Sequence, residues 1–542
     1  MSNSLYMRQC IAVFGTASLQ RYVFQSNRLK ENIGASYLVK YWLDEGLLEA
    51  IKRSGRKVDT TAWDEYKADP SMCRPEKPVD TSKDVNFIYV GGGNAALLCK
   101  NRKIAKEAVK AWSRKLLENA PGLRVVVGYA DVESSLTEAY RSALGNLSQC
   151  EEALPFGDTL YGLPVVRTCT TTGLPASVNS QEGDGWISQS AASKRKQVGS
   201  EREPGAAQKD IRREFRSVLQ KGQNFAIELD KLGGRKGESH IAVVHADGNG
   251  MGKHLIDVVN SAEDDAEFLH HIRAFSASVS RLSQSALQET LQYLQKALLN
   301  LKGDLSLEDE KIFPLRPIVY GGDDLTFVCD GRLGFDLAAF YLKAFSKGKI
   351  KVRGKDESVD ACAGVAIVPT KFPFARAYHF AEELCGLTKS YLRQKSLTGS
   401  WLDFQIIQEG ATRSISALRA AQYRSFEGQT LHQRPYQVPE KWDDFVAILK
   451  EFQSQQWPRS RAKGLLQILT RGPVETQHFI EDAQRRDLKL PSSEVSETGW
   501  TGGDPPDRTT PYFDPLEALD FYLEVKKPAK DGESAGKEIK ND

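Results

Sequence analysis

An internal repeat constrains this chain more than any other feature of its sequence. Residues 11–17 (IAVFGTA) correspond to residues 241–247 (IAVVHAD), and residues 88–99 (IYVGGGNAALLC) correspond to residues 318–329 (IVYGGDDLTFVC). Both correspondences are ungapped and share one offset of 230 residues, since 241 − 11 and 318 − 88 are equal. Two matches at one offset predict a duplicated domain. The alternative is two unrelated pairs of strands with coincidental spacing.

Each copy is predicted to combine strands with helices. In the second copy, apolar residues between Leu269 and Leu298 recur mostly at steps of three, four or seven, which is typical of an amphipathic helix. The runs PIVY and LTFVC flank residues 321–324 (GGDD), which indicates a β-hairpin. A strand over residues 361–368 and a helix over residues 375–393 are expected to follow. This order predicts an α+β fold with helices on one face of an antiparallel sheet.

Changes in composition divide the chain into five regions. We predict the first copy over residues 1–148, a linker with an insertion over 149–235, the second copy over 236–412, a helical C-terminal domain over 413–491, and a linker, docking segment and tail over 492–542. Residues 178–222 are rich in Ser, Gly and charged residues, which favours a linker with helix from Gln208 onward. Residues 526–542 are highly charged and are predicted to be disordered.

Charge and hydropathy exclude two classes of protein. The chain has 73 Lys and Arg against 71 Asp and Glu, a net charge of +2, so a protein that coats nucleic acid is not expected. No apolar run approaches the ~20 residues of a membrane helix. Eight cysteines without a C-x-x-C pair, and an N-terminus without a secretory pattern, predict a cytoplasmic protein without membrane contact. The basic runs at 194–196 and 212–216 have acids nearby, which favours solvated surface over an RNA site.

The two copies differ in their acidic residues. At the 230-residue offset, Asp247, Asp323 and Asp324 correspond to Ala17, Gly93 and Asn94. Adjacent aspartates at a hairpin tip repel each other and gain no hydrophobic stabilisation, so they need a cation or solvent. Asp247 would converge on this tip if its strand pairs with the hairpin. Because magnesium takes a few carboxylates plus substrate phosphate oxygens, the three acids predict a metal and nucleotide site.

A glycine-rich segment follows Asp247. Gly248, Gly250 and Gly252 would let backbone N–H groups approach a polyphosphate, and Lys253 would add positive charge. Asn249 belongs to the same predicted nucleotide-binding segment. The segment is not a G-x-x-x-x-G-K-[ST] loop, so a P-loop ATPase is not predicted. An ordinary Asp/Asn-Gly turn is the alternative interpretation.

An ordered set of motifs carries a family resemblance. The motifs are VVHADGNGMGK (243–253), YGGDDL (320–325), CAGVAIVPTKFP (362–373), AEELCGLTK (381–389) and LDF (402–404). Through them the second copy resembles the palm domain of the large polymerase/cyclase subunit of type III CRISPR effector complexes, and more distantly GGDEF nucleotide cyclases and polymerase palms. The first copy resembles the degenerate first palm of that subunit through residues 19–36 and 89–94. The resemblance covers most of residues 8–410.

The resemblance implies both a fold and an activity. It implies two ferredoxin-like palm domains, similar to nucleotide cyclase and GGDEF domains, plus a helical C-terminal domain. It also implies that cyclic oligonucleotide second messengers, cyclic oligoadenylates above all, are made from ATP in prokaryotic antiviral defence. Two magnesium or manganese ions would be held by Asp247, Asp323, Asp324 and the backbone of Gly248.

The resemblance also suggests nucleotide-binding residues around these acids. Gly321 and Gly322 of the hairpin would lie against the nucleotide, and Lys389 would clamp its triphosphate, with Lys371 as a second candidate. A solvated helix lysine is the alternative interpretation of Lys389. His245 is interpreted as a structural strand residue, although strand alternation places it on the same face as Asp247.

The chain departs from the family pattern in two respects. Many members begin with an HD nuclease domain, whereas this sequence has no His-Asp dipeptide and is not expected to be an HD-type DNase. Members commonly carry a zinc-binding insertion with paired cysteines. Here Thr172 stands where a second cysteine would follow Cys169, so no zinc is expected.

The first copy is predicted to supply a second nucleotide pocket. Its hairpin residues Gly91, Gly92, Gly93 and Asn94 would bind the acceptor nucleotide without metal, or form a simple turn. Pairing of two chains through their palms is the alternative arrangement. Templated or linear nucleotide polymerisation, a cyclic dinucleotide product, and a non-catalytic scaffold that binds nucleotide or RNA are competing functions. RNA, CRISPR-type effector subunits and an effector protein activated by cyclic nucleotides are the expected partners besides ATP.

Overall fold

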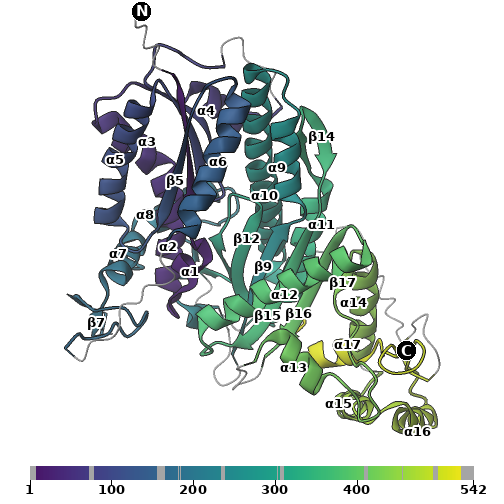
Figure 1. The fold of residues 1–542 in the computed structure, drawn as a ribbon. Coiled ribbons are helices and arrows are strands. Elements are labelled where there is room, and N and C mark those ends of the chain that lie inside the picture. Colours follow the sequence, from purple (N-terminus) through teal and green to yellow (C-terminus); the bar gives the residue numbers. More distant parts are fainter. Residues whose placement is uncertain are drawn as a thin grey trace, which may run out of the picture.

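Two α/β units of the same topology lie side by side in the computed structural model, and a helical domain follows them (Figure 1). The structure describes residues 8–71, 78–154, 165–180, 182–183, 185–232, 239–301, 303–305, 311–407, 413–454, 456–491 and 498–525. None of the helices within these residues is long and apolar enough to cross a bilayer.

The first copy is built on a five-stranded sheet with the strand order β2-β3-β4-β1-β5. Its strands are β1 (Cys10–Thr16), β2 (Val58–Asp59), β3 (Val85–Gly91), β4 (Asn94–Cys99) and β5 (Val125–Asp131). Its helices are α1 (Leu19–Phe24), α2 (Leu29–Leu43), α3 (Glu45–Arg53), α4 (Thr61–Ala68), α5 (Arg102–Asn119) and α6 (Leu136–Glu152). All strand pairs are antiparallel except β2 with β3.

The second copy is built on a six-stranded sheet with the order β11-β12-β9-β15-β16-β17. Its strands are β9 (His240–Gly248), β11 (Leu315–Val319), β12 (Asp324–Asp330), β15 (Ala361–Pro369), β16 (Ser400–Ile406) and β17 (Tyr436–Val438). Its helices are α9 (Met251–Asn260), α10 (Asp265–Leu301), α11 (Gly334–Lys347) and α12 (Phe374–Lys395). A separate hairpin of β13 (Lys349–Val352) and β14 (Lys355–Ser358) follows α11.

The two sheets share their topology, as expected for a duplicated domain. The order β3-β4-β1-β5 matches β11-β12-β9-β15, which is the strand order of a ferredoxin-like fold. The hairpins even share an irregularity, because the register shifts between Phe87 and Tyr89 and again between Pro317 and Val319. The equivalence continues beyond the sequence repeat. Helices α6 and α12 lie so close to β5 and β15 that a Cβ atom at Gly128 or Gly364 would be about 2 Å from a helix carbonyl oxygen.

One strand departs from the 230-residue offset. Asn94 pairs with Gly15, whereas Asp324 pairs with Asp247. Strand β1 is therefore displaced by two residues along its hairpin, and the structural counterpart of Asp247 is Gly15. The offset predicted Ala17 as this counterpart, and the structure corrects that prediction. Neither residue carries a carboxylate, so the first copy still lacks the acid.

Helices cover both faces of the second sheet, which corrects the prediction of a single covered face. Gly334 of α11 packs against Ala242, whereas Gly364, which pairs with His245, packs against α12. Ala242 and His245 are three residues apart on β9, so their side chains point to opposite faces. Helix α12 covers the second face because it connects β15 to β16. These two strands are parallel, and a connection between parallel neighbours needs a crossover helix.

Helix α10 lies between the two copies and holds them together (Figure 1). Its Arg273 is buried and donates hydrogen bonds to the carbonyls of Ile88 and Phe87, at 3.1 and 3.0 Å, where the register of β3 shifts. Its His270 contacts the hydroxyl of Tyr66 from α4 at 2.6 Å. The long apolar pattern that predicted this helix therefore serves both cores.

The segment between the copies is more ordered than its composition suggests. It contains β6 (Val178–Asn179), β7 (Trp186–Ile187), α7 (Gln189–Val198), α8 (Ala206–Glu214), β8 (Asn224–Phe225), which pairs with β10 (Ile312–Phe313), and a 3-10 turn (Leu229–Lys231). Helix was predicted only from Gln208 onward. Lys194 of α7 is fully buried and donates to the carbonyl of Tyr22 at 2.8 Å, and Arg195 pairs with the buried Glu31. The interpretation of residues 194–196 as solvated surface is therefore wrong for Lys194 and Arg195.

The C-terminal region is helical, as predicted. It contains α13 (Ile415–Gln422), α14 (Glu440–Gln453), α15 (Arg459–Leu469), α16 (Pro473–Gln484) and α17 (Phe513–Ala518). Residues 513–525, here called the C-terminal strap, run back over the second copy. Residues 526–542, predicted as a tail, lie outside the described residues.

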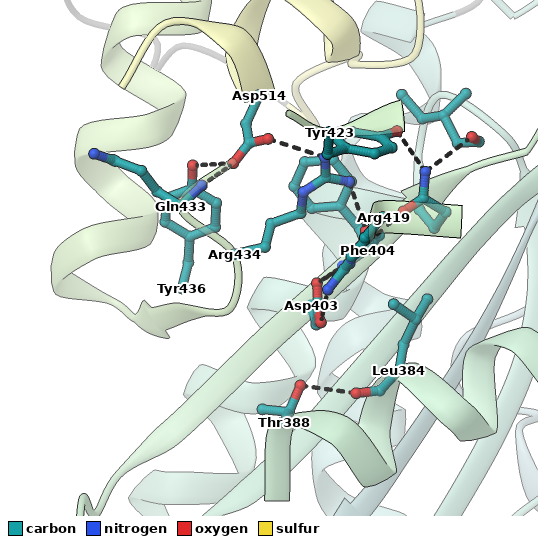
Figure 2. Close-up of polar contacts among 12 residues, drawn as sticks. Leu384, Thr388, Asp403, Phe404, Arg419, Tyr423, Gln433, Arg434, Tyr436 and Asp514 are labelled. Atoms are coloured by element: carbon teal, nitrogen blue, oxygen red, sulfur yellow. Dashed lines mark hydrogen bonds and ion pairs between the residues drawn. The ribbon is translucent and has the colours of Figure 1, made fainter. Parts of the chain in front are cut away.

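A buried ionic network fixes the strap to the second sheet (Figure 2). Arg434 is fully buried and lies 3.0 Å from both Asp514 and Glu517 of the strap. Tyr436 of β17 donates to Asp514 at 2.7 Å. Because single removal of a buried charge partner is costly, this network is expected to set the position of the helical domain on the sheet.

Candidate active site

Two predicted acids meet at the edge where β9 ends and β12 begins. Asp247 is paired in register with Asp324 in the antiparallel ladder. Side chains of such a pair lie on the same face, with their Cβ atoms about 4.5–5.5 Å apart. Asp323 precedes Asp324 at the hairpin tip, and its Cβ would lie 3.3 Å from a Cβ at Gly248. The structure therefore pairs Asp247 with Asp324 on one face of the sheet and places Asp323 next to them at the hairpin tip.

Lys389 of α12 lies beside these acids. Its Nζ is 2.5 Å from Asp247 Oδ2 and donates to the carbonyl of Gly248 at 2.8 Å. These are two of the groups predicted to hold metal. The side chain is half-buried and directed to the site, so it is not an ordinary solvated lysine.

The site carries an excess of negative charge. Burial raises the pKa of Asp324 well above its usual value, and the neighbouring Asp323 and Asp247 raise it further. Burial and then Asp247 also raise the pKa of Asp323. Lys389 offsets only part of this repulsion. A site of this kind favours an additional cation.

The donor groups fit divalent ions that arrive with a nucleotide. Among the described residues, no three His, Cys, Asp or Glu side chains are arranged to hold a metal ion by themselves. Magnesium usually takes one or two carboxylates and completes its coordination with substrate phosphates and water. The carboxylates of Asp247 and Asp324 and the carbonyl of Gly248 are donors of that type.

His245 lies on the same face as Asp247 and is buried. Its Nδ1 is 3.1 Å from Thr326 Oγ1, and its ring packs edge-on against Tyr378 of α12. Burial lowers the pKa of His245 to about 4. The side chain is therefore neutral near pH 7 and packs between the sheet and α12.

The loop after Asp247 is held in place by Asn249. Its backbone N–H donates to the carbonyl of Asp360 at 2.7 Å, and its side-chain amide donates to the carbonyl of Gly399 at 3.3 Å. Asn249 therefore holds the loop in place. The sequence had instead suggested that Asn249 contacts the nucleotide. Gly250 has a φ of 72° and directly precedes α9, whose first turn carries Gly252 and the exposed Lys253. The positive end of the helix dipole near Asp247 favours phosphate there.

Lys371 lies at the wrong end of the sheet to contact this site. It follows β15, whose last residue, Pro369, pairs with His240 at the start of β9. Asp247 lies seven residues further along β9, about 23 Å away at 3.3 Å per residue. Lys371 is therefore removed from the predicted nucleotide-binding set, because β15 runs antiparallel to β9.

The tips of the two hairpins touch at equivalent glycines. A Cβ atom at Gly322 would lie 2.9 Å from the Cα of Gly92, so position 322 needs a residue without a side chain, whereas a Cβ at Gly92 would meet no atom within 4 Å. Ser280 of α10 donates to the carbonyl of Gly321 at 3.0 Å and lies against Gly91. The hairpin predicted to hold an acceptor nucleotide is therefore adjacent to the acidic hairpin.

A cavity of about 650 Å³ lies beside the paired tips. Residues 91–94 and 321–324 both line it, together with residues of α2, α8 and α10. Asp247 and Lys389 do not line it, because they lie toward α12.

A polar cluster in this cavity was missed by sequence reasoning. Lys40 lies 3.0 Å from Asp210, 2.8 Å from Glu214 and 5.3 Å from the ring centroid of Tyr320. Burial alone would lower the pKa of Lys40, but these partners raise it. Asp210 and Glu214 belong to α8, in the segment predicted as linker, and no local motif connects them with Lys40.

The first copy has a different pair of groups at the position of Asp247 and Lys389. Gly128, Ala143 and Leu147 are equivalent to Gly364, Ala381 and Cys385 in the contact of helix with sheet. Four residues further along each helix lie Glu151 and Lys389. A Cβ at Gly15 would lie 3.2 Å from Oε1 of Glu151. The first copy therefore has an acid where the second has a lysine, which disfavours phosphate at that position.

The comparisons with known proteins agree with the motifs. Residues 240–398 match the family model described as Cas10/Cmr2, second palm domain. Similar solved structures include the Csm1–Csm4 cassette in complex with pppApA (12% identity, TM-score 0.50) and with cA3 (11% identity, TM-score 0.50), each covering 96% of this chain and 70% of the matched chain. Csm1 in T. onnurineus is 14% identical with a TM-score of 0.50, over 95% of this chain and 69% of that chain. No curated protein matches the sequence. The family model confirms the resemblance over residues 240–398, and the solved structures confirm the fold.

Proposed function

We propose that this chain, a Cas10-like palm-domain protein, is a metal-dependent nucleotidyltransferase that joins ATP molecules into cyclic oligoadenylates, which act as second messengers in prokaryotic antiviral defence. The observation that carries the proposal is the in-register pair of Asp247 and Asp324 beside Asp323 and Lys389. A buried group of carboxylates with unbalanced charge has no stabilising role in a core and is typical of a site that binds cations.

Asp247, Asp323, Asp324 and the carbonyl of Gly248 would hold two magnesium or manganese ions. Bound ions of this kind supply charge neutralisation at the leaving pyrophosphate and activate the attacking hydroxyl. In the proposed step, the 3′-oxygen of one nucleotide bonds to the α-phosphorus of a second nucleotide, and pyrophosphate leaves. The chain's contribution is positioning and charge stabilisation, because the transferred group needs in-line geometry.

Residues of the second copy would bind the triphosphate of the donor. Lys389 is placed to move from Asp247 to a phosphate once cations occupy the acids. The first turn of α9, with Gly252 and Lys253, presents N–H groups and positive charge near Asp247. Asn249 would keep the intervening loop in position.

The hairpin of the first copy would hold the acceptor nucleotide. Residues 91–94 touch the acidic hairpin and line the cavity beside it. Glu151 repels phosphate on the outer side of this hairpin, so the acceptor would enter with its sugar toward Asp324 and its phosphates elsewhere. The structures of similar fold that contain pppApA and cA3 make adenosine triphosphate the first substrate to test.

The test is incubation of the purified chain with each radiolabelled nucleoside triphosphate and magnesium or manganese, with and without added RNA. Products resistant to phosphatase are expected from ATP. Asp324→Asn should abolish them, whereas Asp487→Asn, an exposed aspartate in the C-terminal domain, should leave them unchanged. Phosphatase-sensitive products would instead indicate a linear polymerase. Nucleotide binding without product under all conditions would indicate a scaffold and contradict the proposal.

A further inference from the structure

Helix α5 of the first copy carries a row of cations on its outer side. Lys103, Lys106, Lys110 and Arg114 recur at steps of three or four, so they lie on one face of the helix. All four are exposed, and Figure 1 shows α5 at the left edge of the molecule. Within the described residues, the ammonium groups of Lys103, Lys106 and Lys110 make no hydrogen bond or ion pair.

The acids of α5 do not neutralise this row. Glu107 pairs with Arg56 of the loop between α3 and β2, and Glu118 pairs with Lys115 at 2.8 Å. Glu118 also lies 3.8 Å from Arg114, a weaker exposed pair. The chain as a whole is nearly neutral, with a net charge of +2, so the concentration of charge on this helix is local.

The duplicated fold supplies an internal comparison for this surface. Helix α11 of the second copy occupies the same place, after the second hairpin strand and before the fourth strand. At the 230-residue offset, the buried residues correspond: Ala105 to Phe335, Ala108 to Ala338 and Trp112 to Leu342. Two outward residues also correspond in place but not in chemistry, Lys106 to Asp336 and Lys110 to Phe340, whereas Lys103 corresponds to Leu333, which is buried just before α11.

The face of α11 is covered by the chain itself. Asp336 accepts hydrogen bonds from the hydroxyl of Tyr293 at 2.9 Å and from the backbone of Val525 in the C-terminal strap at 3.2 Å. Phe340 stacks on Tyr293 with ring centroids 4.1 Å apart. The strap also donates from Leu523 to the carbonyl of Arg332 at 2.9 Å. An apolar and acidic face thus receives a peptide segment of the same chain.

The geometry points to a different occupant on α5: we propose that the face formed by Lys103, Lys106, Lys110 and Arg114 binds the phosphate backbone of RNA. Where α11 has Asp336, which contacts the strap, and Phe340, which stacks on Tyr293, α5 has lysines, so charge is the attractive force on this face. The row extends about 16 Å along the helix at 1.5 Å per residue, which matches several consecutive phosphates. Contacts of this kind position a strand without reading its sequence.

The test measures binding of a fluorescein-labelled, mixed-sequence single-stranded RNA to the full chain by anisotropy at several salt concentrations. The variant is Lys103→Gln/Lys106→Gln/Lys110→Gln. The control variant is Lys395→Gln/Lys441→Gln/Lys489→Gln, which removes three exposed lysines elsewhere and has the same net charge. Loss of three phosphate contacts at about 0.7 per contact reduces the salt slope by about 2. Over a fourfold rise in salt, the affinity of the unaltered chain should then fall about 20-fold more than that of the variant.

The outcomes separate this proposal from its alternatives and from the proposed catalytic function. A weakened salt slope in the α5 variant alone, with unchanged melting temperature and unchanged synthesis from ATP in the absence of RNA, supports the proposal. Equal effects in both variants would show only general attraction and would overturn it. Unchanged RNA binding together with lost binding of polyglutamate would assign the face to an acidic polypeptide and would also overturn it.

Discussion

Adding a methyl group at Gly322 tests how closely the two hairpin tips approach. A Cβ there would lie 2.9 Å from the Cα of Gly92. Because non-bonded carbon atoms prefer separations of about 3.5–4.0 Å, the tips would have to separate by at least about 0.6 Å. Gly92 Cα is a backbone atom, so no change of rotamer can relieve the contact. Overpacking of this kind costs about 1–3 kcal/mol of unfolding free energy.

The same displacement should reduce the proposed reaction. A misplacement of about 1 Å between reacting groups costs about 100-fold in rate, so a separation near half that value predicts about a tenfold loss. The rate of oligonucleotide formation from radiolabelled ATP is measured at saturating magnesium, and the unfolding free energy is measured by urea denaturation.

Two glycine variants serve as controls for Gly322→Ala. A Cβ at Gly92 would meet no atom within 4 Å, but its φ of 59° makes Gly92→Ala cost about 1–2 kcal/mol of backbone strain without a clash. A Cβ at Gly145 on α6 also meets nothing, and Gly145→Ala should stabilise the helix by about 1 kcal/mol. Gly145→Ala should keep the wild-type rate, and Gly92→Ala, which lies in the proposed acceptor pocket, is a control for stability alone. Wild-type rate and stability in Gly322→Ala, or an equal loss of rate in Gly145→Ala, would refute the close approach of the tips.

Two further predictions concern buried charges. Arg434→Met should lower the unfolding free energy by about 3–5 kcal/mol, because it leaves the buried carboxylates of the strap without their partner. Lys450→Met, which removes an exposed pair, should cost less than about 1 kcal/mol, and similar urea midpoints for both would contradict the assignment. Burial lowers the pKa of Lys194 to about 8, whereas an unfolded lysine titrates near 10.4. The unfolded chain thus binds more protons between these values, and stability should rise with pH across that window relative to Lys194→Met. If the unfolding free energies of the unaltered chain and of Lys194→Met, measured in urea, changed in parallel from about pH 7.5 to 9.5, this prediction would be contradicted.

The second copy was the most predictable part of the molecule. Its hairpin, the strand before it and the long helix between them are local patterns, and few sheets can be built from them in that order. The neighbouring positions of β9 and β12 follow from this order, but the register that pairs Asp247 with Asp324 does not, because β1 is displaced by two residues in the same arrangement. Lys389 was assigned from the family resemblance, and the structure places it on α12.

Other features depend on contacts that are distant in sequence. The displacement of β1 keeps every side chain on its original face, so the hydrophobic pattern cannot reveal it. Lys371 was misplaced because its position depends on the direction of β15, which no local pattern reports. The burial of Lys194 and Arg195 depends on partners in the first copy, more than a hundred residues away. The polar composition of this segment therefore suggested that Lys194 and Arg195 are exposed, whereas the fold buries them.

The displaced strand β1 also limits how the first copy can evolve. Aspartates at positions 93 and 94 would restore an acidic tip, but the residue opposite that tip is Gly15, which lies against Glu151. A carboxylate introduced at position 15 would meet this glutamate instead of a lysine. Recovery of a second centre would require changes at four sites on β1, the hairpin and α6, and acids introduced before Glu151 is replaced would gather without a counter-charge. The difference between the two copies therefore lies in the register of β1 as well as in the side chains.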